Sequence, residues 1–144
     1  MDSARRRLFF HGSLLFLLGL AEGGIIPLLA KPRLALSTHV GTLISGLFLI
    51  ALGAVFSELD LSARLQRWVY WLALSGQYAS CLAFFLAAAF GTNSITKING
   101  GGPGGQPWQE AVVTVLFNVG GVAAVGCLFP VVWGLRGRGE KAGS

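Results

Sequence analysis

The chain has 144 residues, of which 53% are hydrophobic and 12% are charged. An ordinary soluble domain carries about twice that share of charged residues, so this composition excludes a soluble monomer. The 11 Lys and Arg residues outnumber the 6 Asp and Glu residues, which gives a net charge of +5. These basic residues stand at the ends of apolar stretches, where they orient membrane helices, so we expect no nucleic-acid partner.

Four apolar stretches are long enough to cross the hydrocarbon core of a bilayer. They predict an all-α integral membrane protein, a four-helix bundle that forms a single domain over residues 1–144. A transmembrane barrel is a poor alternative because strict alternation of apolar and polar residues is absent. The predicted spans cover residues 8–30, 36–56, 65–90 and 110–135.

The basic residues lie mainly on one side of the predicted bundle. By the positive-inside rule, the N- and C-termini should be cytoplasmic, in a multi-pass protein of the cell (inner) membrane. The third loop, residues 91–109, carries a Gly/Pro-rich run that is either a cap over a site or a linker. Eight basic residues share the side of the termini, namely Arg5, Arg6, Arg7, Arg64, Arg67, Arg136, Arg138 and Lys141, and the other side has Lys31, Arg33 and Lys97.

Small residues four positions apart recur in every span and allow helices to approach closely. Because four short helices enclose little volume, a site shared between protomers and a homo-oligomer are expected. Cys81 and Cys127 stand within apolar runs and are interpreted as small hydrophobic residues. The spaced pairs are Gly19 with Gly23, Gly41 with Ser45, Gly76 with Ser80, and Gly120 with Ala124.

His39 is the first candidate ligand, because a polar residue within a span is a functional candidate by default. With Ser37 or Thr38 as the helix N-cap, the positive end of the helix favours a neutral ring that can bind a metal. One histidine without companions cannot build a zinc site, but it can be the axial ligand of a haem. The alternative is a histidine bonded to a backbone carbonyl. His11, near the cytoplasmic end of the first span, is interpreted as interfacial.

Glu22 falls in the outer half of the first span, near the depth of His39. It is either a proton relay or the wall of a polar pocket, or else an interfacial residue in a deformed helix. No hydrolase or kinase motif is present. Five further polar residues line an interior cavity or only join helices by hydrogen bonds, namely Ser45, Gln77, Tyr78, Ser80 and Asn118.

The segment at residues 32–41, PRLALSTHVG, and the SGLF segment at 45–48 resemble the hydroxylaminobenzene mutase family of small four-helix membrane proteins. The resemblance extends to residues 61–66, 71–73, 109–112 and 133–137. More distantly, the layout resembles styrene oxide isomerase, through His11-Gly12, through His39 at the start of the second span, and through the Gly/Pro-rich third loop.

The resemblance implies a trimeric isomerase with haem b at protomer interfaces, whose iron acts as a Lewis acid on the oxygen of a small aromatic substrate. His39 matches the axial histidine. Both families tend to carry asparagine where this chain has Ser45 and near Ser80, and a tyrosine of styrene oxide isomerase aligns with Phe84. The catalytic candidates are therefore Ser45, Ser80, Tyr78 and Asn118, with Glu22, Gln77 and Phe84 as candidate pocket residues.

The leading hypothesis is a haem-b-dependent membrane mutase that converts an arylhydroxylamine into 2-aminophenol. An isomerase that converts an epoxide into an aldehyde is the alternative within the same class. A non-catalytic haem protein or a structural membrane protein are the alternatives from other classes. A bis-histidine cytochrome is disfavoured because His11 and His39 are predicted near opposite sides of the membrane.

Overall fold

The computed structural model describes residues 2–93 and 104–136, which form four long helices and two short turns of 3₁₀ helix. All four long helices are apolar and long enough to cross a membrane, and no strand occurs in the described residues. The all-α fold is therefore confirmed. The elements are α1 (Asp2–Ile25), η1 (Ile26–Leu28), α2 (Pro32–Val55), η2 (Phe56–Glu58), α3 (Ala63–Phe90) and α5 (Pro107–Leu135).

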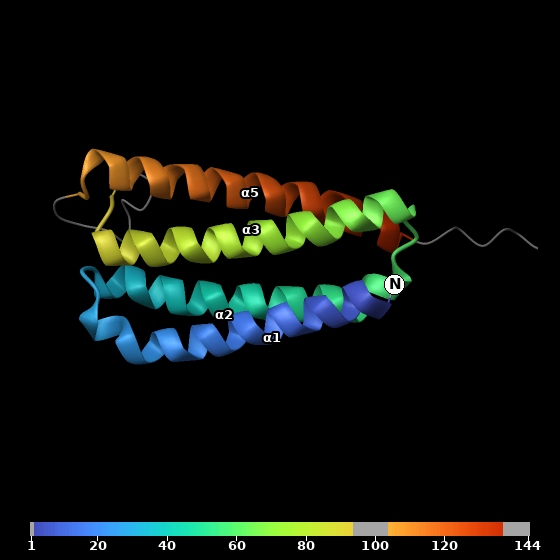
Figure 1. Cartoon of the computed structure of the whole chain (residues 1–144), viewed down its shortest axis with the longest axis horizontal. Coiled ribbons are helices and arrows are strands. Elements are labelled where there is room, and N and C mark those ends of the chain that lie inside the picture. Colours follow the sequence, from blue (N-terminus) through green and yellow to red (C-terminus); the bar gives the residue numbers. More distant parts are fainter. Residues whose placement is uncertain (1, 94–103, 137–144) are drawn as a thin grey trace, which may run out of the picture.

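The helices form two antiparallel hairpins that lie side by side (Figure 1). α1 packs on α2 and α3 packs on α5, while α2 against α3 is the main contact between the hairpins. The start of α1, the α2–α3 connection and the end of α5 lie at one end of the molecule. This arrangement agrees with an even number of spans, and the cytoplasmic orientation of that end stays a prediction.

The helices begin earlier than the hydropathy pattern predicts. α1 starts at Asp2, because polar and basic residues can extend a helix beyond the hydrocarbon core. α2 starts at Pro32, since proline is well suited to the first position of a helix. The predicted N-cap at Ser37 or Thr38 is wrong, since both lie inside α2 and donate hydrogen bonds to the carbonyl four residues earlier. His39 therefore lies beyond the first turn, where the helix dipole has little effect.

Glycines set the distance between the helices within each hairpin. A Cβ atom added to Gly46 of α2 would lie 2.7 Å from the carbonyl oxygen of Gly12 in α1. In the other hairpin, a Cβ atom on Gly76 would lie 3.4 Å from the carbonyl oxygen of Gly120 and 3.3 Å from the backbone nitrogen of Ala124. The predicted close approach at the Gly76 and Gly120 pairs is confirmed.

Glu110 holds together the two ends of the third loop. Its Oε1 atom accepts hydrogen bonds from the backbone N–H groups of Asn93 (2.8 Å) and Gly105 (3.0 Å). Lys31, from the α1–α2 connection, donates a hydrogen bond to the Asn93 side chain and so joins the two hairpins at this end. Most of the Gly/Pro-rich run predicted to be a cap or a linker lies in 94–103, outside the described residues.

Candidate functional site

His39 is held between α2 and α1 by a hydrogen bond to the main chain. Its Nδ1 atom lies 2.6 Å from the carbonyl oxygen of Gly19. A carbonyl oxygen only accepts, so Nδ1 carries the proton, and in the neutral ring Nε2 keeps a free lone pair. The ring also packs on Gly23, where an added Cβ atom would lie 3.2 Å from Cε1. The Gly19–Gly23 pair thus provides the space and the acceptor that orient the imidazole.

This bond is the alternative predicted from the sequence, a histidine bonded to a backbone carbonyl, and it is also compatible with binding a metal through Nε2. Histidines that ligate metals through one nitrogen commonly donate the other N–H to a backbone carbonyl, which fixes the tautomer. Within residues 2–93 and 104–136, no group of three or more His, Cys, Asp and Glu residues could hold a metal ion. A zinc centre needs three or four protein ligands, whereas a single histidine held in this way could serve as the axial ligand of a haem, whose porphyrin supplies four of the iron ligands.

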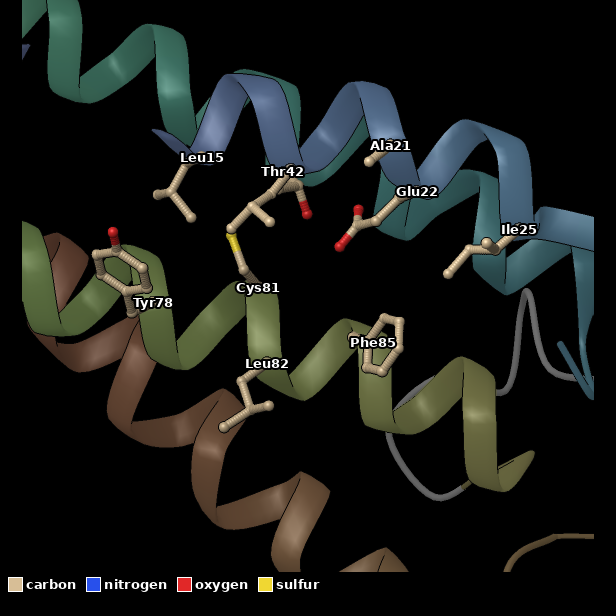
Figure 2. A pocket seen from close by; sticks show the side chains of 10 residues that line it. Leu15, Ala21, Glu22, Ile25, Thr42, Tyr78, Cys81, Leu82 and Phe85 are labelled. Carbon is tan, nitrogen blue, oxygen red and sulfur yellow. The ribbon is translucent and has the colours of Figure 1, made fainter. Parts of the chain in front are cut away.

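A pocket of about 400 Å³ lies between α1, α2 and α3 (Figure 2). Its volume is within the range of pockets that bind small molecules. Most of its surface is apolar, and the polar or polarisable side chains are Glu22, Thr42, Tyr78 and Cys81. His39 is not among its lining residues. The apolar lining consists of Leu15, Leu18, Ala21, Ile25, Leu82 and Phe85.

Two oxygen atoms in this pocket have no hydrogen-bond partner. They are Oε2 of Glu22 and Oγ1 of Thr42, both shielded from solvent. Figure 2 shows the Glu22 carboxyl group directed from α1 into the space between the helices, on the side of Thr42. Glu22 also lies close enough to His39 to interact electrostatically. A polar group that is buried without a partner costs free energy, so this pair needs an explanation.

Tyr78 closes the pocket at the end nearer the N-terminus. Its hydroxyl lies 2.9 Å from Nδ1 of His11, and the two rings meet edge to face. His11, interpreted from the sequence as interfacial, is half-buried and connects α1 to α3 through this bond. The structure thus brings Glu22, a predicted pocket residue, and Tyr78, a predicted catalytic residue, to one pocket.

Ser45 lies next to this pocket and not in its lining. It is buried, with 7% of its surface exposed, and stands close to the Cys81 thiol. Ser80 packs at the crossing of α3 with α5, where its hydroxyl covers Gly120. Ser45 is therefore near the pocket, whereas Ser80 contacts the partner helix of its own hairpin.

The remaining predicted residues point elsewhere in the single chain. Phe84 packs edge to face on Phe117 of α5, with ring centroids 4.6 Å apart. Asn118 is exposed on α5, and its amide donates to the carbonyl oxygen of Thr114 at 2.8 Å. Gln77 is half-buried on α3. The structure does not bring these side chains to the pocket of this chain.

Thr42 and Cys81 are the pocket residues that the sequence interpretation missed. The signal for Thr42 was its spacing, because His39, Thr42 and Ser45 follow one another at three-residue intervals and so share a face of α2. Cys81 had no such signal. As a small apolar residue in an apolar helix, it differs in no visible way from Cys127, which is buried between α3 and α5.

Comparisons with known proteins give a consistent match along the chain. The sequence profile of the styrene oxide isomerase family matches residues 4–136. Hydroxylaminobenzene mutase HabB of Ectopseudomonas oleovorans is 36% identical over 133 residues, which cover 91% of this chain and 80% of the relative. Hydroxylaminobenzene mutase HabA of the same organism is 36% identical over 110 residues, covering 76% of this chain and 82% of the relative. No solved structure matches this chain.

Proposed function

This chain belongs to the styrene oxide isomerase family and is an isomerase of aromatic compounds, and we propose that it is a haem-b-dependent hydroxylaminobenzene mutase. The two mutases that it matches along most of their length support arylhydroxylamine as the substrate. Conversion of an arylhydroxylamine into 2-aminophenol is redox-neutral. It therefore requires no electron donor or acceptor.

The hydrogen bond from His39 to Gly19 is the observation that carries the cofactor proposal. It fixes the imidazole of α2 with Nδ1 protonated and Nε2 free to bind iron. The haem, when bound, supplies a Lewis-acidic iron for the oxygen of the substrate. Everything else that the reaction needs must come from the polypeptide.

The rearrangement moves a hydroxyl group and one proton within the substrate. The N–O bond breaks with its electron pair on oxygen, and that pair then forms the C–O bond to the ortho carbon of the ring. The ortho carbon loses its hydrogen as a proton, and the nitrogen gains one proton. The atoms and electrons balance without a co-reactant.

The apolar pocket contributes by excluding water. Cleavage of the N–O bond leaves an electron-deficient aromatic group, which water would capture in competition with the migrating hydroxyl. Side chains such as Leu15, Leu82 and Phe85 line the pocket and limit this side reaction. Among the side chains that line the pocket, Glu22 and Thr42 each have a buried oxygen without a hydrogen-bond partner.

We also propose that the working unit is a homotrimer in the cell (inner) membrane. His39 does not line the pocket of its own chain, and a haem bound at the boundary between protomers would account for this separation. α1 packs mainly on α2 and α5 mainly on α3, which leaves apolar helix faces available to other protomers. Native mass spectrometry from detergent would give three chains, and a monomer that retains activity would contradict this assembly.

Isomerisation of an epoxide into an aldehyde is the second candidate, because the family profile carries that name. The structure gives it less support. Phe84, which aligns with a tyrosine of styrene oxide isomerase, packs on Phe117 and offers no hydroxyl. An epoxide bound here would therefore lack a hydroxyl group at this position.

Product analysis tests the proposed reaction directly. Purified protein supplied with haem is incubated with phenylhydroxylamine and, separately, with styrene oxide. The proposal expects 2-aminophenol from the first substrate at a much higher kcat/KM than phenylacetaldehyde from the second. Conversion of styrene oxide alone would replace the proposed reaction with the epoxide reaction.

A further inference from the structure

We propose that Glu22 and Thr42 form a binding site for the polar group of the aromatic substrate, and that this pair selects compounds that carry N–H or O–H donors. The inference deepens the proposed function and rests on it for the identity of the substrate. It assigns specificity between hydroxylamine and epoxide to two residues on α1 and α2.

The first support is the burial of unpaired acceptors. Thr42 is 2% exposed, and its hydroxyl has no hydrogen-bond partner, although a threonine in a helix can readily bond to the carbonyl four residues earlier. Thr38, one turn before it, does so with Leu34 at 3.0 Å. The Thr42 hydroxyl therefore stands at the wall of the pocket without a partner in hydrogen-bond geometry, close to Oε2 of Glu22.

The second support is the shape and chemistry around the two oxygens. Leu18, Leu82 and Phe85 offer apolar surface for an aromatic ring within the same pocket of about 400 Å³. A ligand that places its ring there brings its polar substituent within reach of the carboxyl and hydroxyl groups. A small number of polar atoms that converge in an otherwise apolar pocket is the usual pattern of a small-molecule site.

The third support is hydrogen-bond complementarity. A carboxyl group accepts hydrogen bonds in either protonation state, while a hydroxyl both donates and accepts. An arylhydroxylamine or an aminophenol presents N–H and O–H groups and satisfies both side chains. An epoxide presents only an acceptor oxygen and cannot donate a hydrogen bond to Glu22. Sites built around a hydrogen bond discriminate strongly against analogues that cannot make it.

Equilibrium titration with two stable probes tests the assignment without relying on turnover. The probes are 2-aminophenol, which carries donors, and anisole, an aromatic of similar size without them. The unchanged protein, in detergent and with haem, is compared with Thr42→Val and Glu22→Gln. Thr38→Val is the matched control, because that hydroxyl is already bonded within its own helix.

The unchanged protein and Thr38→Val should bind 2-aminophenol more tightly than anisole. Thr42→Val should reduce this preference by about threefold to tenfold, and Glu22→Gln by a similar factor, because the amide replaces one acceptor oxygen with a donor. The affinity for anisole should stay the same in all variants. The same variants should raise KM for phenylhydroxylamine more than they lower kcat.

Three results would overturn the inference: an unchanged preference in both pocket variants, an equal loss in Thr38→Val, or no preference in the unchanged protein. Thermal unfolding checks that the variants are folded, and valine in place of threonine keeps the shape of the side chain. Failure of the proposed function looks different. In that case the protein would prefer 2-aminophenol over anisole and lose this preference on Thr42→Val, yet would not convert phenylhydroxylamine.

Discussion

At Gly46 the backbone of α2 lies very close to that of α1, which makes the packing of the first hairpin testable. A Cβ atom at this position would lie 2.6 Å from the backbone nitrogen of Phe16 and 2.7 Å from the carbonyl oxygen of Gly12. Both neighbours are main-chain atoms and cannot rotate away. The Gly46→Ala substitution must therefore push the two helices apart.

The cost follows from how far the helices have to move. Ordinary contacts of a Cβ atom begin at 3.4 Å, so the backbones would separate by several tenths of an ångström at the crossing. Overpacking of this kind costs about 1–3 kcal/mol, while alanine regains up to about 1 kcal/mol of helix propensity. We expect a net loss of about 1–2 kcal/mol in the free energy of unfolding.

Thermal unfolding in detergent measures this loss, with Gly121→Ala as the control. Gly121 lies on α5, where an added Cβ atom meets nothing within 4 Å, so that variant should be as stable as the unchanged protein or slightly more stable. Gly46→Ala should also retain less haem, because separating α1 from α2 lengthens the bond from His39 to Gly19. Equal stability of the two variants would refute the packing argument.

Two further predictions concern the end of the bundle that carries the third loop. Glu110→Ala removes the acceptor of two backbone N–H groups. In a denaturant titration this variant should lower the free energy of unfolding by about 1–3 kcal/mol. Unchanged stability would show that water replaces the carboxylate. Gly91→Ala should lower the free energy of unfolding by about 1–2 kcal/mol in the same titration, because Gly91 ends α3 in the left-handed conformation, at a φ of 72°. A variant as stable as the unchanged protein would contradict this left-handed cap.

The hydropathy pattern was sufficient to predict the four helices, because apolar stretches of this length have few other structures available in a bilayer. It could not place their ends. Basic residues such as Arg5 stand outside the apolar run yet continue α1, and Pro32 starts α2 four residues before its predicted first residue. The hydropathy pattern indicates which residues lie in the hydrocarbon core, whereas capping residues and proline determine the first residue of a helix.

The site was predictable only in part, because a single sequence does not show which helix faces meet. His39 and Glu22 stood out as ionisable residues in apolar helices. Thr42 did not, since threonine is common in membrane helices and its importance depends on an unpaired hydroxyl that only the packed structure reveals. Asn118 appeared equally suited to a pocket, but its rotation on α5 leaves it exposed and bonded to its own helix.

The visible spectrum of the purified protein, as isolated and after addition of dithionite, tests the central claim most directly. The unchanged protein and His11→Ala should both show a Soret band, since the Nδ1 atom of His11 lies against Tyr78, in a different part of the bundle. His39→Ala should lose the band and the isomerase activity together. Full haem occupancy in His39→Ala, or a flat spectrum of the unchanged protein after haem reconstitution, would contradict the assignment of His39 as the iron ligand.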